Sequence, residues 1–422
     1  MSNRKFYLFV IFLLLSSLWL AGCGSLLNAA EEAVGGDYGP EYVPQEQQTR
    51  TFEALWKHLT DSYIYFDTAD VDWNALHDKY DSQIQAGLTD EQFADSLGEL
   101  QAELPPGAFL YQSRSERIQA DVTDASSYEG IGAIVGFQGE EKPHIVILDV
   151  IDGSPAENAG LKPHDSIYEI DGSPILLEEG LKVVNRIRGP AGSTVTLQVK
   201  TPGKSERAVE VTRGKLNSSG KLETQQIPGT NYGYMLFPPL SYASMADDIR
   251  AALQGLTTNQ KLEGLVLDLR VAGSSRGWPL QELLTMFFNG KIGEFYNRNN
   301  ETQPLTVQGE DYVSSQTVPL IILIGSNTSG SPEILAAGLQ AEKRATLVGE
   351  PTAGSFEATE AFYLPDGSRI FVETASFRLA NGKEIGSSGV QPDVALNEGW
   401  DDIQPSADPV LEKAVELLDA QK

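Results

Sequence analysis

Two serines flank a glycine at a point where an apolar run gives way to a predicted helix. Ser329 and Ser331 lie on either side of Gly330, just before Pro332. A hydroxyl at either position could attack a peptide carbonyl, but serine is a weak nucleophile until a neutral base lies within hydrogen-bond reach. Ser331 has a second role open to it, because Ser before Pro is a common helix start, with Ser as the N-cap. The sequence favours that structural role for Ser331 and leaves the nucleophilic role open for both serines.

No obvious base lies near these serines in the sequence. Lys383 follows the turn signal Asn381-Gly382 and is expected to be exposed. A lysine base must instead be buried, so that its pKa falls enough to leave it neutral. All four histidines precede the serine segment; two are expected at solvated helix positions and two in a β-rich region, namely His58, His77, His144 and His164. No His, Cys and carboxylate cluster has the spacing of metal ligands, so no metal or organic cofactor is expected.

The segments around the serines predict an α/β core over residues 230–398. Residues 265–269 and 320–324 are continuous apolar runs, typical of strands that are buried on both faces. Residues 278–288 and 332–339 have the composition of helices. Alternation of strands and helices predicts right-handed crossovers and a mixed, largely parallel sheet.

Helices are predicted at both ends of the chain. Over residues 48–125 the apolar spacing is helical, and Thr89 with Gln92 forms a capping-box signature before a helix that ends near Leu104. The last segment, residues 399–422, carries apolar residues at helical spacing from Pro409 to Ala420.

Between the helical region and the core, residues 126–214 change to short strands bounded by Gly and Pro. This segment resembles a PDZ domain at three places, of which residues 153–161 and 187–195 match a helix-containing turn and the end of a second helix with the last strand. The third place, after Ser127, resembles the loop and first strand that receive a peptide C-terminus: Tyr128, Glu129, Gly130, Ile131 and Gly132. Converging backbone N–H groups suit a carboxylate there, and an exposed sheet edge suits the rest of the peptide.

The N-terminus has the pattern of a targeting segment. Arg4 and Lys5 precede an apolar run over residues 6–20, which is short for a spanning helix. Leu20-Ala21-Gly22-Cys23 resembles a bacterial lipobox, so residues 1–22 are expected to be a signal peptide and Cys23 the lipidated N-terminus. An ordinary cleaved signal with an incidental Cys, or a retained anchor, stays open. Residues 23–47 are predicted to be an acidic tether between the membrane and the folded domains. A lipidated Cys23 predicts a location on the extracytoplasmic face of a membrane.

The charge excludes one large class of partner. Without residues 1–22 the chain has 29 basic and 59 acidic residues, a net charge of −30. Such a surface repels nucleic acid and anionic headgroups, so no nucleic-acid partner is expected and membrane contact is expected only through the lipid anchor.

The order of helical region, PDZ domain and α/β core resembles the C-terminal processing (tail-specific) serine peptidases. Three core segments add to the likeness, namely residues 231–235, 364–368 and 389–393. The resemblance implies a multidomain α+β and α/β fold, and protein or peptide C-terminal tails as ligands.

The catalytic positions of that family are substituted in this chain. The family places a Ser three residues before a Glu-Ile pair, a Lys about 25 residues later and a Gln four residues further on. Aligned without gaps, these positions hold Gly330, Ser355 and Thr359. In the segment that helps to bind the developing negative charge, Asp268-Leu269-Arg270 is retained, but Ala272 replaces an Asn and Ser274-Ser275 replaces a pair of glycines.

Three functions remain open from the sequence. The first is a lipid-anchored serine endopeptidase with Ser331, or less readily Ser329, as the nucleophile. The second is a non-catalytic relative that binds the C-terminal tails of extracytoplasmic proteins. The third is a structural envelope lipoprotein with an unused PDZ domain.

Overall fold

The computed structural model describes residues 44–105, 107–125, 128–139, 142–216, 221–258, 261–273, 275, 277–404 and 407–422. The predictions for the signal peptide, Cys23 and most of the tether therefore lie outside the described residues, as do those for Ser127 and Ser274. Contacts divide the chain into two units, and residues 297–301 and 358–376 belong to the first unit together with the N-terminal region up to residue 127. No helix of the described residues is long and apolar enough to span a bilayer.

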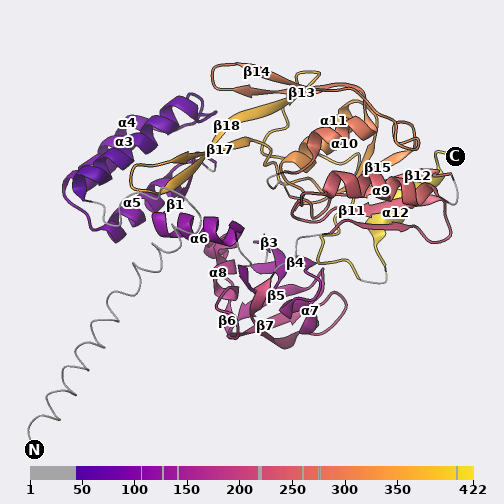
Figure 1. Cartoon of the computed structure of the whole chain (residues 1–422), viewed down its shortest axis with the longest axis horizontal. Helices are drawn as coiled ribbons and strands as arrows, with labels where there is room; N and C mark the ends of the chain where they lie inside the picture. The colour runs from indigo at the N-terminus through magenta and orange to yellow at the C-terminus, as the bar shows by residue number, and fades with distance from the viewer. Residues whose placement is uncertain are drawn as a thin grey trace, which may run out of the picture. The chain divides into compact units, whose positions relative to one another are not determined.

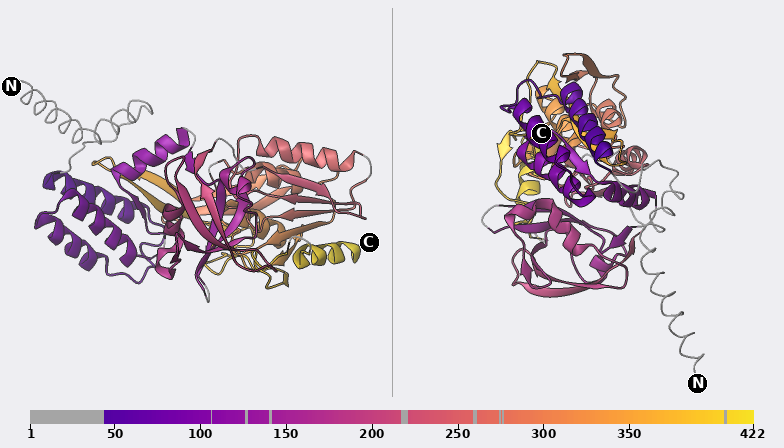
Figure 2. Two further views of the ribbon diagram at one scale, coloured as in Figure 1. Left: turned by 90° about the horizontal axis from the view of Figure 1, so that it is seen from below. Right: turned by 90° about the vertical axis from the view of Figure 1, so that its left-hand side faces the viewer.

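The first unit is built on three helices, α3 (Gln45–Ser62), α4 (Trp73–Gln85) and α5 (Asp90–Glu103), which lie side by side (Figure 1, Figure 2). The capping box at Thr89 and Gln92 is confirmed, and it begins α5 where the sequence predicts. A fourth helix and three antiparallel strands complete the unit: α6 (Arg114–Ala125), β1 (Leu110–Gln112), β17 (Ala358–Tyr363) and most of β18 (Arg369–Leu379).

The second unit contains the PDZ domain, a sheet with strand order β3-β4-β5-β7-β8 in which β6 also pairs with β5. Its strands are β3 (Ala133–Gln138), β4 (His144–Val150), β5 (Ser166–Ile170), β6 (Ser173–Pro174), β7 (Thr194–Lys200) and β8 (Arg207–Thr212). Short helices α7 (Pro155–Asn158), η1 (Leu177–Val183) and α8 (Val184–Ile187) accompany them, and β2 (Tyr128–Gly130) pairs with β9 (Gly214–Leu216). Strand β3 is an edge strand.

The α/β core is a six-stranded sheet with strand order β10-β11-β12-β15-β16-β19. Only β10 is antiparallel to its neighbour, so the mixed, largely parallel sheet is confirmed. The strands are β10 (Glu223–Gln226), β11 (Tyr232–Leu236), β12 (Gly264–Asp268), β15 (Leu320–Ile324), β16 (Thr346–Gly349) and β19 (Val394–Ala395). The helices are α9 (Met245–Thr257), α10 (Leu280–Phe287), α11 (Ser331–Ala341) and α12 (Pro409–Asp419), and β13 (Gly290–Asn297) forms a hairpin with β14 (Thr302–Val307).

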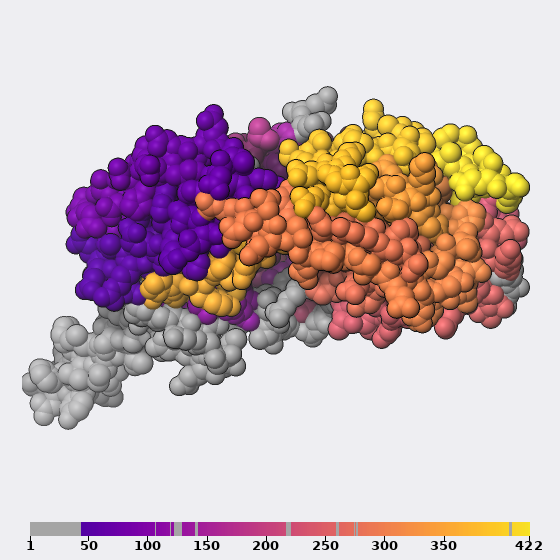
Figure 3. Space-filling model, turned by 90° about the horizontal axis from the view of Figure 1, so that it is seen from above, coloured from indigo at the N-terminus to yellow at the C-terminus, as the bar shows by residue number. Residues whose placement is uncertain are grey.

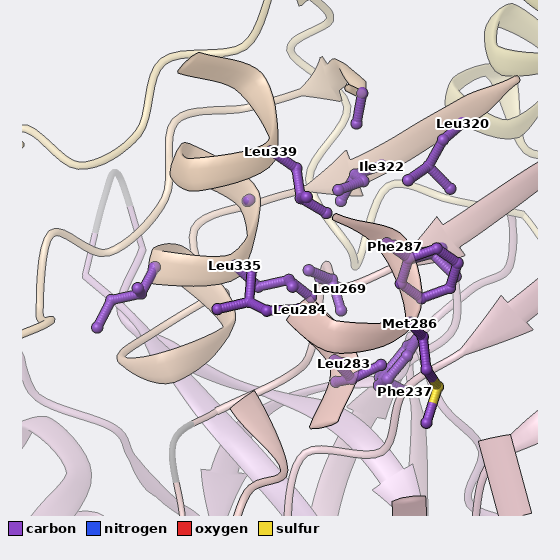
Figure 4. Close-up of a cluster of buried hydrophobic side chains, with 14 of the residues drawn as sticks. Phe237, Leu269, Leu283, Leu284, Met286, Phe287, Leu320, Ile322, Leu335 and Leu339 are labelled. Atoms are coloured by element: carbon purple, nitrogen blue, oxygen red, sulfur yellow. The ribbon is translucent and has the colours of Figure 1, made fainter. Parts of the chain in front are cut away.

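Alternation along the strands gives the sheet two buried faces, because successive side chains point to opposite sides. On one face, Leu267 and Ile322 pack with α9, α10 and α11, and Figure 4 shows Leu335 and Leu339 of α11 in this cluster. On the other face, Val266 packs against α12, whose outer side lies at the surface (Figure 3). Apart from Asp268 at the end of β12, each of the two central strands is therefore apolar, as the sequence indicates.

A buried ion network fixes the end of β12 to the start of α12. Arg270 forms paired hydrogen bonds with Asp268 and with Asp408, the shortest being 2.5 and 2.6 Å, and the Tyr234 hydroxyl donates to Asp268 over 2.7 Å. Asp408 also caps α12 by accepting from the backbone N–H of Val410. Burial raises the pKa of Asp408, but Arg270 outweighs burial and holds it below its ordinary value.

Replacing Arg270 should destabilise the fold strongly. Arg270→Leu leaves two carboxylates in a buried site without their cation, and we expect the free energy of unfolding to fall by about 3–5 kcal/mol in urea at neutral pH. The loss should shrink as the pH falls toward about 4 and below, because in the variant Arg270 no longer opposes burial and the Asp408 carboxyl takes up a proton more readily. Arg50→Leu, which removes an exposed pair with Glu46, is the matched control and should change stability by less than about 1 kcal/mol. A loss no larger than that of the control would show that the network contributes little.

Candidate functional site

The candidate site lies where three neighbouring parallel strands end. Strands β12, β15 and β16 end at Asp268, Ile324 and Gly349, and each is followed by one of the loops that the sequence singles out. The carboxyl ends of parallel strands meet at one edge of a sheet, which is where α/β proteins place their ligands.

Hydrogen bonds tie the three loops together. The Thr328 hydroxyl donates to the Leu269 carbonyl over 2.8 Å, and the Ser329 N–H donates to the Ala272 carbonyl over 3.1 Å. From the third loop, the Ala353 N–H donates to the Thr328 carbonyl over 3.0 Å. The backbone around Ser329 is therefore held on both sides by its neighbours.

Gly330 begins α11 in a conformation that other residues avoid. Its φ is 70° and its ψ is −126°, a left-handed turn for which glycine carries no steric penalty. Gly330 is also the N-cap of α11, so the prediction that Ser331 is the N-cap is wrong: Ser331 is the first helical residue and Pro332 the second. The cause is the sharp turn at Gly330, because of which α11 begins at Ser331, one residue before the predicted start at Pro332.

Glu333 is the residue that holds this turn in place. Its side chain is fully buried and accepts from the N–H groups of Gly330, Gly354 and Ser355 over 2.7–2.9 Å, and from the Thr352 hydroxyl. Four donors occupy both carboxylate oxygens, so the group is committed to structure and is not free to act as a base. The sequence showed Glu333 only as an alignment landmark, and this role was missed.

The same carboxylate brings together two of the substituted positions. The N–H groups of Gly330 and Ser355 donate to one oxygen of Glu333, over 2.8 and 2.9 Å. The positions where the resemblance expects a nucleophile and its base are therefore neighbours. Neither holds such a group, since Gly330 has no side chain and Ser355 is exposed in a loop. Thr359 lies on β17, in the first unit, and is exposed.

The two candidate serines are both half-buried. A Cβ built on Gly273 would lie 3.4 Å from the Ser329 hydroxyl oxygen, so Ser329 faces the loop after β12. Within the described part of the chain, no Lys or His forms a hydrogen bond with the Ser329 hydroxyl. In the same loop, Ser275 donates to the Ser241 hydroxyl over 2.8 Å.

The histidines are engaged elsewhere. None lies in the α/β core, and His144 and His164 fall in the PDZ domain, as predicted. The prediction of solvated positions for His58 and His77 is not confirmed, because both are half-buried against aromatic rings: the His58 ring stacks on Phe362 with centres 4.2 Å apart, and the His77 ring contacts both Phe52 and Trp56. Burial lowers the pKa of His58. Lys383 is exposed, as predicted, and no group of three or more metal-ligating side chains occurs among the described residues.

The predicted peptide-binding segment leads into the edge strand of the PDZ domain. Residues 128–130 form β2, and the carbonyls of Ile131 and Gly132 accept from Ala156 and Ile151 within the domain. Gly132 has a φ of 82° and turns the chain into β3, while Glu129 is exposed and accepts from the Ala191 N–H over 2.9 Å.

The short helix η1 contacts this edge strand and carries exposed leucines. Leu176, Leu177 and Leu181, in or just before η1, are 47–61% exposed, and a Cβ on Gly139, just after β3, would contact Leu177. The end of β3 also contacts the α/β core, because the Gln138 amide donates to the Ser326 hydroxyl over 3.4 Å. The edge strand therefore lies between apolar side chains and the loop that leads to Ser329.

Comparison with known proteins gives the same order of parts. Residues 231–396 match Peptidase family S41, residues 146–201 match the PDZ domain, and residues 44–102 match the Tricorn protease C1 domain. A carboxyl-terminal-processing protease of Picosynechococcus sp. is 30% identical over 387 residues, which cover 86% of this chain and 87% of the relative. The chain belongs to the carboxyl-terminal-processing protease family.

Other members support this placement. The carboxy-terminal processing protease CtpB of Bacillus subtilis is 29% identical over 303 residues, covering 68% of this chain and 59% of CtpB. Among solved structures, the photosystem II D1 C-terminal processing protease superposes with a TM-score of 0.66 at 24% identity, covering 88% of this chain and 97% of that one. The second likeness confirms the fold expected from the sequence.

Glu333→Gln tests the role of the buried carboxylate. The amide would turn an N–H group toward backbone donors, so we expect the free energy of unfolding to fall by at least about 2 kcal/mol. Glu342→Gln, at the exposed C-terminal end of the same helix, is the control and should stay within about 0.5 kcal/mol of the parent protein. Denaturation in urea measures both, and equal stability of the two variants would contradict the role given to Glu333.

Proposed function

We propose that this chain is a non-catalytic member of its family, which binds the C-terminal tails of extracytoplasmic proteins and is anchored to a membrane through a lipid on Cys23. The main support for the proposed loss of hydrolysis is that the N–H groups of Gly330 and Ser355 donate to the same carboxylate oxygen of Glu333, so that these two residues are neighbours. The two positions that must hold a nucleophile and its base are adjacent, and neither residue can perform the role.

The binding half of the proposal rests on strand β3. An edge strand with free pairing groups can take an extended peptide as an additional strand, and apolar side chains beside it can receive the side chains of the tail. Leu177 and Leu181 are the exposed apolar side chains at that place. A tail with an apolar last residue is the ligand that this surface favours.

A serine endopeptidase is the second candidate, and one observation favours it. The Ser329 hydroxyl faces Gly273, in the loop where the family binds the developing negative charge. Ser329 and Ser331 are the possible nucleophiles. The third reading, a structural lipoprotein, predicts no preference for peptides with a free carboxylate.

A paired binding and cleavage assay separates these functions. The chain from residue 24 onward is incubated with an unstructured polypeptide that ends in an apolar residue, and with the same polypeptide amidated at its C-terminus. We expect binding of the free-acid form only, without cleavage. Leu177→Glu should weaken binding at least tenfold, because it places a charge where the apolar residue binds, while Leu240→Glu, at another exposed leucine, should not.

The cleavage arm includes its own positive and negative controls. The combined variant Gly330→Ser, Ser355→Lys and Thr359→Gln rebuilds the family's three side chains and should gain activity, at a cost of about 1–3 kcal/mol for Ser in the left-handed turn. Cleavage by the parent chain that is lost in Ser329→Ala or Ser331→Ala would contradict the non-catalytic proposal. Absence of both binding and cleavage would leave the structural lipoprotein.

Anchoring through Cys23 is tested separately. Expressed with residues 1–22 in a bacterium, the chain should fractionate with membranes and label with a fatty-acid analogue. Cys23→Ser should abolish labelling, because the serine hydroxyl cannot form the thioether and this is the only cysteine. A labelled Cys23→Ser protein, or an unlabelled parent, would contradict the anchor.

A further inference from the structure

A turn near the C-terminus is attached to the PDZ domain by side chains that the proposed function does not use. In residues 399–402, the Trp400 indole N–H donates to the Ile147 carbonyl over 3.1 Å, and the Trp400 carbonyl accepts from His164 over 2.6 Å. The next residue, Asp401, accepts from His144 over 2.8 Å and from the Ser166 hydroxyl over 3.0 Å. Two consecutive residues thus meet both histidines of the PDZ domain.

The turn is also packed into the core. Trp400 is 6% exposed and shares a small apolar cluster with Val271 of the core and Val146 and Leu148 of β4. The Arg270 guanidinium lies 5.2 Å from the centre of its ring, within the range of a cation–π contact. Trp400 therefore connects β4 to the ion network at the end of β12.

His144 fits this contact only as a cation. Its Nδ1 faces the Lys142 carbonyl at 2.9 Å, while its Nε2 faces the Asp401 carboxylate. Both partners are acceptors, so both ring nitrogens must carry a proton. The ring of Tyr168 lies 4.9 Å away, and the Lys142 ammonium lies over that ring and 3.9 Å from Glu206. Burial lowers the pKa of His144, but Asp401 and the Lys142 carbonyl outweigh burial and raise it above its ordinary value.

His164 fits as a neutral ring. Its Nδ1 donates to the Trp400 carbonyl, and its ring packs against the indole with centres 4.0 Å apart. A second proton would place a cation in a half-buried position near Arg270, an effect that Asp268 and Asp408 offset only in part. Burial, followed by Arg270, lowers the pKa of His164.

We propose that residues 399–402 are a pH-sensitive clasp, which fastens the PDZ domain to the α/β core near neutral pH and loosens in acid and in alkali. Because the clasp contacts Arg270, two residues before the carbonyl that accepts from Ser329, its release also removes a support from the candidate site. The contacts that Trp400 and Asp401 make with the PDZ domain form whether or not the chain cleaves peptides.

The direction of the pH dependence follows from proton linkage. A histidine whose pKa is raised on docking stabilises the docked form below its free pKa, and that stabilisation is lost as the pH rises through the raised value. A histidine whose pKa is lowered stabilises the docked form above its free pKa, and that stabilisation is lost as the pH falls through the lowered value. His144 therefore weakens the clasp in alkali and His164 in acid, with the strongest docking near the ordinary histidine pKa, about 6.5.

Hydrogen exchange at the Trp400 indole tests the clasp directly. The chain from residue 24 onward carries ¹⁵N in its tryptophans, Trp400→Phe assigns the signal, and the buried Trp278 indole serves as an internal reference. After correction for the intrinsic exchange rate, protection of Trp400 relative to Trp278 should be greatest near pH 6.5. It should fall about tenfold on each side for each unit by which docking shifts the pKa.

Conservative variants show which histidine causes the fall in Trp400 protection on each side of the pH maximum. His144→Gln keeps an N–H toward Asp401 but does not titrate, so it should remove the fall in alkali. His164→Asn keeps a donor and suits the left-handed φ of 74°, so it should remove the fall in acid down to about pH 4. Below that pH the clasp should still weaken, because burial raises the pKa of Asp401 but His144 outweighs burial and holds it below its ordinary value, so that protonation of Asp401 removes the contact. His77→Gln, whose partner Glu53 lies in the first unit, should leave the profile unchanged. Protection of Trp400 that follows Trp278 at every pH, no protection at any pH, or parent-like profiles in both PDZ variants would overturn the proposal.

Discussion

The geometry of the candidate site depends on one buried carboxylate. Glu333 gathers the backbone of two loops, through Gly330 on one side and Gly354 and Ser355 on the other, and its fourth donor is the Thr352 hydroxyl. Removing a carboxylate from water on folding costs free energy unless its oxygens accept hydrogen bonds from the protein, and four donors meet that requirement for Glu333. The turn at Gly330, the start of α11 and the position of the Ser355 loop follow from satisfying this single group.

The backbone supports of the site are present, while the positions at which the family resemblance expects a nucleophile and its base hold Gly330 and Ser355. The Asp268–Arg270 pair stays buried at the end of β12, and the loops after β12, β15 and β16 stay joined by backbone hydrogen bonds. These features fix the fold and need no chemistry at Gly330 or Ser355. The proposed loss of nucleophile and base is therefore compatible with an intact architecture, since the residues that stabilise the site differ from those that would react there.

Much of the architecture could be predicted because it follows from local patterns. The apolar runs at Leu265 and Leu320 become central strands, and the capping box at Thr89 begins its helix as expected. The N-cap at Gly330 could not be predicted, and Ser331 was predicted in its place, because the positive φ of Gly330 is set by Glu333 and the loop that contains Ser355. The contacts of Trp400 with the PDZ domain join residues more than 230 positions apart in the sequence. The periodic spacing of apolar residues predicts helices and strands, but it does not predict which distant residues meet.

The central claim, that the site holds no activated serine, is tested most directly by a reagent that needs no substrate. A fluorophosphonate ester forms a stable adduct only with a serine whose hydroxyl is activated by a base. Intact-mass analysis of the chain from residue 24 onward, after incubation with this reagent, should show no added mass, while the variant that rebuilds the three family side chains should gain one adduct on Ser at position 330. An adduct on Ser329 or Ser331 of the parent chain would contradict the account.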